Sequence, residues 1–156
     1  MSDKSQRKHV LYLLRGGGAH ISFDDTVADF PVELCGKQID GLPYTGWQVL
    51  EHMRIAQWDI LEFSRDGSHV SPDWPKGYWP KPEQTGTPDL WHESVERFRA
   101  DLKEMEALLE DDSKDLFAKI PHGDGQTILR EALLVADHNA YHLGVLVAMQ
   151  RLLKAN

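Results

Sequence analysis

Two histidines one helical turn apart are the residues of this chain best suited to chemistry. His138 and His142 lie in an apolar segment, residues 127–153, which contains no proline and is typical of a helix. Positions i and i+4 share one face of a helix, so the two imidazoles can hold one metal ion. Aliphatic residues recur on the same heptad spacing, from Ile128 to Leu152. The pattern therefore predicts that this face points into a helical core.

A metal site needs more than two protein ligands, and His52 is the best candidate for the third. It lies on the apolar stripe of a second amphipathic segment, so it is also expected to face the core. Buried imidazoles must satisfy both ring nitrogens, and a shared divalent ion answers that demand. Three histidine ligands leave a position open for water or substrate, which is typical of catalytic zinc sites. The alternative is three separate core histidines, each with its own hydrogen-bond partner.

Two carboxylates occupy core positions on the same stripes. Asp59 follows His52 by one heptad, and Glu131 precedes His138 by one heptad. If the two helices run antiparallel, both carboxylates lie on the same side of the histidines, about 10 Å along the helix axis. Each is interpreted either as a catalytic general base or substrate contact, or as a residue that only forms an ion pair or orients a helix end.

Four long amphipathic segments form the predicted frame for these residues. Hydrophobic periodicity predicts helices over residues 3–15, 45–64, 87–110 and 127–153, and Ser22 is expected to cap a further short helix. Thr45 and Gln48 form a capping box, and Thr87-Pro88-Asp89 is typical of a helix start. No segment is typical of a strand. The chain is therefore predicted to be all-α, with residues 1–156 forming a single four-helix-bundle domain.

The segment of residues 66–87 is a long link rich in proline, glycine and aromatic residues. It can travel the length of a helix, so the second and third long helices are expected to run parallel, joined by a crossover. Its aromatic residues either line the mouth of a pocket or anchor the link on the bundle: Trp74, Tyr78 and Trp79. The remaining histidines have no evident partner and are expected at the surface or in turns: His9, His20, His69, His92 and His122.

Composition narrows the classes of partner. The formal net charge of −8 argues against a nucleic-acid partner, which requires a basic surface. No apolar run reaches the roughly 20 residues that span a bilayer, and the polar residues 1–8 do not lead into a signal peptide. We therefore expect a cytoplasmic protein with no membrane partner. The single cysteine, Cys35, is interpreted as a structural or surface thiol.

The chain resembles the DinB-like (DinB/YfiT-like) superfamily of metal-binding four-helix bundles along essentially its whole length. Two motifs carry most of the resemblance: Leu50-Glu51-His52-Met53 and Asp137-His138-Asn139-Ala140-Tyr141-His142-Leu143-Gly144. Two shorter motifs strengthen it: Trp58-Asp59-Ile60 and His122-Gly123-Asp124-Gly125.

This resemblance implies an up-down-down-up bundle, a homodimer, and a divalent ion such as zinc, nickel or iron held by His52, His138 and His142. It also implies chemistry with low-molecular-weight thiols, which several related enzymes use. Relatives often carry glutamine where this chain has Val145, so the pocket here is expected to be more apolar.

Three functions remain open at this stage. The first is a metal-dependent enzyme, a thiol S-transferase or a hydrolase, that acts on a small-molecule substrate. The second is a non-catalytic metal- or small-ligand-binding protein, with a role in stress. The third is a metal-free bundle that acts through its surface.

Overall fold

Five α-helices make up the fold of residues 3–155, the part of the chain that the computed structural model describes. They are α1 (Asp3–Leu14), α2 (Phe23–Asp29), α3 (Gly46–Arg65), α4 (Pro88–Glu110) and α5 (Ile128–Ala155). Two short 3-10 helices lie in the connections, η1 (Val32–Leu34) and η2 (Lys76–Tyr78). Residues 3–155 contain no strand, only an isolated bridge between Lys119 and Thr127. The prediction of an all-helical chain is confirmed.

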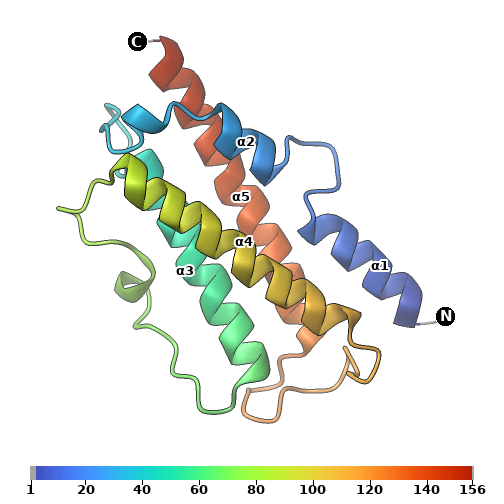
Figure 1. The fold of residues 1–156 in the computed structure, drawn as a ribbon. Helices are drawn as coiled ribbons and strands as arrows, with labels where there is room; N and C mark the ends of the chain where they lie inside the picture. The colour runs from blue at the N-terminus through green and yellow to red at the C-terminus, as the bar shows by residue number, and fades with distance from the viewer. Residues whose placement is uncertain (1–2, 156) are drawn as a thin grey trace.

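The centre of the molecule is α3, which packs against both α4 and α5 (Figure 1). Helix α1 contacts α4 and α5, and the short α2 lies against α5. Helices α3 and α4 begin at the same end of the molecule, whereas α5 runs in the opposite direction (Figure 1). The link of residues 66–87 therefore returns the chain along the length of α3, as its length predicts.

The helix starts are set by local sequence. The side chain of Ser22 accepts a hydrogen bond from the Asp25 backbone at the start of α2. Thr45 and Gln48 form the predicted capping box at the start of α3. Thr87 caps α4, which has proline at its start. Each cap satisfies backbone N–H groups that have no partner within the helix, which is why these boundaries can be predicted.

The apolar stripe of α5 departs from the heptad prediction near its C-terminal end. Val135 and Met149 are buried as expected, but Leu152 is 44% exposed and Leu153 is buried in its place. An α-helix has 3.6 residues per turn, so a seven-residue spacing drifts by about 20° per heptad. Over the length of α5 this drift carries Leu152 out of the core, and the prediction for that residue is wrong.

A polar layer divides the apolar core into two clusters. One cluster surrounds Met53, Phe98 and Leu143, and the other surrounds Leu61, Met105 and Val135. Between them, Gln57 donates a hydrogen bond to the Phe98 carbonyl at 2.7 Å, and Asn139 donates to the Gln57 side-chain oxygen at 2.8 Å. Since Gln57 is only 1% exposed, these bonds satisfy an amide that would otherwise be buried at a cost. The layer fixes α3, α4 and α5 against one another.

Helix α5 is the one helix within residues 3–155 that is long and apolar enough to cross a membrane, with a mean hydropathy of 1.2 over 18 residues. The core helix of a soluble protein passes the same test. Only 28% of that window is buried, so much of this apolar helix remains on the surface.

Candidate metal centre

His52 from α3 meets His138 and His142 from α5 inside the fold. The Nε2 atom of His52 lies 3.1 Å from Nε2 of His138 and 3.2 Å from Nε2 of His142. One nitrogen of each ring lies within 4.8 Å of the others. His52 is 4% exposed, and the other two are half-buried. The structure thus brings together the three histidines that the two apolar stripes predicted.

The surroundings keep these rings neutral. The Nδ1–H of His52 donates a hydrogen bond to the Tyr78 carbonyl at 2.8 Å, so its Nε2 presents a lone pair to the other two rings. Burial lowers the pKa of His52, against the opposing effect of that carbonyl. Burial, and next the charge of His52, lowers the pKa of His138 to about 4. Burial and the charges of His138 and His52 lower the pKa of His142 to about 4. Neutral imidazole is the form that binds metals.

The three nitrogens cannot satisfy one another. The single lone pair on His52 Nε2 accepts one N–H, so no more than one of the other two rings is paired there. The Nδ1 atom of His138 is also buried and has no hydrogen-bond partner in the described part of the chain. Metal–nitrogen bonds of about 2.0–2.1 Å in a tetrahedral site place the nitrogens about 3.4 Å apart, close to the separations observed here. The residues therefore fit a divalent metal ion.

Aromatic rings hold His52 from the side. Trp79 stacks on His52 with the ring centroids 3.8 Å apart and 2° between the ring planes. Tyr44 stacks in turn on Trp79, also at 3.8 Å. The link of residues 66–87 therefore holds His52 at two points, through the Trp79 ring and through the Tyr78 carbonyl. This role was missed at the level of the sequence, since neither the stacking nor the carbonyl contact leaves a spacing pattern.

A pocket of about 380 Å³ opens onto His52 and His138. Asp59 from α3 and Glu131 from α5 both line it, so the antiparallel course of these helices brings the two carboxylates to one pocket, as expected. The rest of the lining combines five apolar residues, Ala56, Ile60, Phe63, Trp74 and Leu134, with four polar ones, Ser71, Tyr78, Gln126 and Arg130. Trp74 is 79% exposed at this pocket, so of the two interpretations of that residue the pocket-mouth one holds.

The two carboxylates differ in their partners. Both oxygens of Asp59 accept hydrogen bonds, from the Tyr78 hydroxyl at 2.6 Å and from the His69 Nε2–H at 2.7 Å. Burial and the neighbouring carboxylate raise the pKa of Tyr78 to about 12, so its hydroxyl remains a donor. The expectation that His69 has no partner is wrong, because its side chain is 9% exposed and bonded to Asp59. Glu131, 2% exposed, pairs with Arg130 at 2.6 Å.

Cys35 lies outside this site. It is 1% exposed in the first apolar cluster, and burial is the main cause that raises the pKa of its thiol. A buried thiol with a raised pKa is a poor nucleophile. Its interpretation as a structural residue is confirmed.

The comparison with known protein families agrees with the fold and the site. A family model described as the DinB superfamily matches residues 22–146, which include His52, His138 and His142. The match covers well over half of the 156 residues. No curated protein and no solved structure matches the chain. By this match the chain belongs to the DinB superfamily.

Proposed function

We propose that the chain binds a divalent metal ion through His52, His138 and His142 and acts as a metal-dependent enzyme on a small-molecule substrate. The reaction would be a thiol S-transfer, with a low-molecular-weight thiol as partner, or a hydrolysis. The observation that carries the proposal is the convergence of three Nε2 atoms beside a pocket. Three protein ligands leave a position for substrate. Zinc, nickel and iron all accept imidazole ligands.

The chemistry divides between the ion and the chain. A divalent ion held by these ligands supplies Lewis acidity, which lowers the pKa of a thiol or of a water molecule. We assign proton transfer to Glu131, because its partner Arg130 is 58% exposed and has room to move away. Asp59 accepts two hydrogen bonds from the protein already, so its contribution is to hold Tyr78 and the link in place.

The second candidate is a non-catalytic metal- or small-ligand-binding protein with a role in stress, which uses the same site. The observation in its favour is that both buried carboxylates already have partners within the protein, Tyr78 and His69 for one and Arg130 for the other. If both carboxylates only stabilise the pocket, neither is left to act as a general base, and the site binds without catalysing a reaction.

We further infer that α1, α3, α4 and α5 form an up-down-down-up four-helix bundle. The shared direction of α3 and α4, joined by the long link, and the opposite direction of α5 support this arrangement (Figure 1).

We propose that the protein is a homodimer that pairs through the exposed side of α5. That side carries Leu133, 43% exposed, and Tyr141, 70% exposed, with the exposed Asp137 between them and Gly144 and Ala148 towards the helix end. Small residues allow a second helix to approach closely, and an apolar surface of this kind favours association. Sedimentation velocity should give a dimer for the native chain and a monomer for Ala148→Glu. The same substitution at the exposed Ala107 of α4 is the control. A monomer in sedimentation velocity of the native chain would contradict the proposed dimer.

Metal analysis of protein purified without a histidine tag tests the metal site. One equivalent of a divalent metal is expected, and His52→Ala and His142→Ala should both lose it. His92→Ala is the matched control, because His92 is exposed on α4 and should leave the metal content unchanged. Full occupancy in either of the first two variants would contradict the site.

Turnover separates the enzyme from the binding protein. The metal-loaded chain is screened by thermal shift against low-molecular-weight thiols and electrophiles, and the compounds that bind are then assayed for reaction. Glu131→Gln should keep the metal and lose at least about a hundredfold in rate, since a general base contributes about 10²–10⁴-fold. Metal and ligand binding without turnover in the native chain would favour the second candidate.

A further inference from the structure

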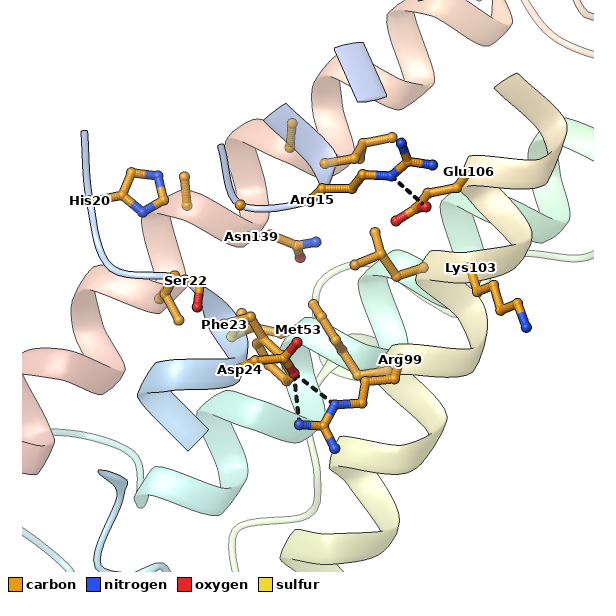
Figure 2. Close-up of a pocket in the computed structure, with 17 residues that line it drawn as sticks. Arg15, His20, Ser22, Phe23, Asp24, Met53, Arg99, Lys103, Glu106 and Asn139 are labelled. Carbon is orange, nitrogen blue, oxygen red and sulfur yellow. Dashed lines mark hydrogen bonds and ion pairs between the residues drawn. The ribbon is translucent and has the colours of Figure 1, made fainter. Parts of the chain in front are cut away.

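A second pocket, here called the back pocket, lies between α1, α2, α4 and α5 (Figure 2). Its volume is about 470 Å³, and it shares no lining residue with the pocket at the histidines. Met53, Asn139 and Leu143 line it, and each directly follows one of the three histidines in the sequence. Successive residues of a helix point about 100° apart, so α3 and α5 present one side to each pocket.

The floor of the back pocket is apolar. Met53, Phe98 and Leu143 are at most 5% exposed, and Phe23 stacks on Phe98 with the ring centroids 4.0 Å apart. A volume of this size with an apolar floor is typical of a site for a small organic molecule. The floor can therefore accommodate the aliphatic or aromatic part of a ligand.

One oriented polar group faces this floor. Asn139 lines the pocket, and its Nδ2–H donates to Gln57, whose own amide is held by the Phe98 carbonyl. This chain of bonds fixes which end of the Asn139 amide is the oxygen. Within residues 3–155 that oxygen, Oδ1, has no hydrogen-bond partner. It is therefore available to accept a hydrogen bond from a ligand.

The rim of the pocket carries three cationic side chains, two of which pair with carboxylates. Arg99 pairs with Asp24 at 2.7 Å, and Arg15 pairs with Glu106 at 2.8 Å, as the dashed lines in Figure 2 show. Arg15 also pairs with Glu110 at 2.5 Å. Lys103, one turn after Arg99 on α4, lines the pocket without an ion pair in the described part of the chain. Of the cationic side chains that line the pocket, Lys103 is therefore the one without a carboxylate partner among residues 3–155, and it favours an anion at this edge, although the whole chain has a net charge of −8.

We propose that the back pocket binds an amphipathic hydroxycarboxylate. Its carboxylate is held at the α4 edge by Lys103. The ammonium of Lys103 points away from the pocket in Figure 2, and rotation of its flexible stem brings it over the ligand. The apolar body lies on Met53 and Phe98, and a hydroxyl at the other end donates to Asn139 Oδ1. This site does not depend on a metal ion at the histidines.

Three compounds of one size and shape test the ligand class: 3-(4-hydroxyphenyl)propanoate, 3-phenylpropanoate and 3-phenylpropan-1-ol. The protein carries ¹³C-labelled methionine methyl groups, and the Met53 resonance is assigned with Met53→Leu. We expect a saturable shift of the Met53 signal, whereas Met105 and Met149, which do not line the pocket, should not move. Equal shifts at all three, or no saturable shift, would overturn the site.

The relative affinities test the two polar contacts. Loss of the carboxylate should weaken binding about two- to fivefold, as expected for an exposed ion pair. Loss of the ring hydroxyl should weaken it about two- to tenfold, the range of a neutral hydrogen bond. An alcohol that binds as tightly as its carboxylate would overturn the assignment of an anion, and a ring hydroxyl without effect would overturn the contact with Asn139.

Two variants complete the test. Lys103→Gln should lower the affinity for both carboxylates and leave the affinity for the alcohol unchanged. The control is Lys119→Gln, at an exposed lysine that lines neither pocket, which should bind all three compounds as the native chain does. Ala140→Trp, at an exposed lining residue, should fill the pocket and abolish binding of all three compounds. Retained binding in Ala140→Trp, or equal affinities in Lys103→Gln and the native chain, would overturn the proposal.

Discussion

Acid is expected to destabilise the metal-free protein through the histidine centre. The pKa values of His138 and His142 are lowered to about 4 in the folded chain, whereas an unfolded histidine has a pKa of about 6.5. Between these values the unfolded chain binds protons that the folded chain does not. The free energy of unfolding therefore keeps its full value above about pH 6.5 and falls as the pH is lowered towards 4.

The magnitude follows from the same pKa values. One pKa unit corresponds to about 1.36 kcal/mol, so the difference between about 6.5 and about 4 gives about 3 kcal/mol for each histidine by pH 4. Both rings remain partly in contact with solvent, which screens their charge. We therefore expect the pair to remove about 3 kcal/mol in total, a large part of the typical stability of a small domain.

Urea unfolding in the presence of a chelator, at a series of pH values from about 7.5 to 4.5, measures this effect. Other groups also titrate in this range, so the decisive quantity is the difference between the native chain and His138→Gln/His142→Gln. The double variant should lose stability less steeply, and His92→Gln should follow the native chain, because His92 is exposed. Equal slopes in the native chain and the double variant would refute the reasoning. Without the chelator, a saturating divalent metal should raise the curves of the native chain and of His92→Gln, but not that of the double variant, by about 2.7 kcal/mol at one hundred times the Kd.

Three further substitutions probe the groups around the site. Tyr78→Phe removes one of the two hydrogen-bond donors to the buried Asp59 carboxylate, so the free energy of unfolding should fall by about 1.5–3 kcal/mol. The backbone contact from Tyr78 to His52 remains, so the metal content should stay the same. Trp79→Ala removes the ring that stacks on His52 and should weaken metal affinity about tenfold, measured by competition with a chelator, with helix content unchanged. Gln57→Leu leaves the Asn139 amide N–H without its partner, whereas the Phe98 carbonyl keeps its hydrogen bond within α4, and should lower the urea midpoint by the equivalent of about 1–2 kcal/mol. A Gln57→Leu variant as stable as the native chain would show that the polar layer adds nothing to stability.

Local signals explain why much of the frame was predictable from the sequence. Ser22, Thr45 and Thr87 begin their helices by satisfying backbone groups a few residues away, so the evidence for each start lies within a short window. Helical periodicity likewise places His138 and His142 on one face. The prediction failed at Leu152 because small angular errors accumulate along a long helix.

Contacts between distant segments explain what was missed. The Tyr78 carbonyl that orients His52 is a backbone atom, which any residue at that position would supply. His69 lies in the link and bonds to Asp59 on α3. The link has no helical periodicity, so the sequence does not indicate which way the His69 side chain points. The stacking of Trp79 on His52 depends on the path of the same link. The three histidines were therefore predictable, whereas the groups that orient them were not.

The polar layer in the core is difficult to explain by stability alone. Well-packed apolar residues often stabilise a core as much as a buried polar group does, and both helices are apolar on either side of Gln57 and Asn139. What the layer does provide is orientation. Gln57 holds the Asn139 amide towards the back pocket, and the same turn of α5 then directs His138 towards His52. Any rotation of α5 that improved one of these contacts would displace the other. The histidine centre and the back pocket therefore share α5 as a common rigid element, and the buried amides that fix its rotation are needed by both.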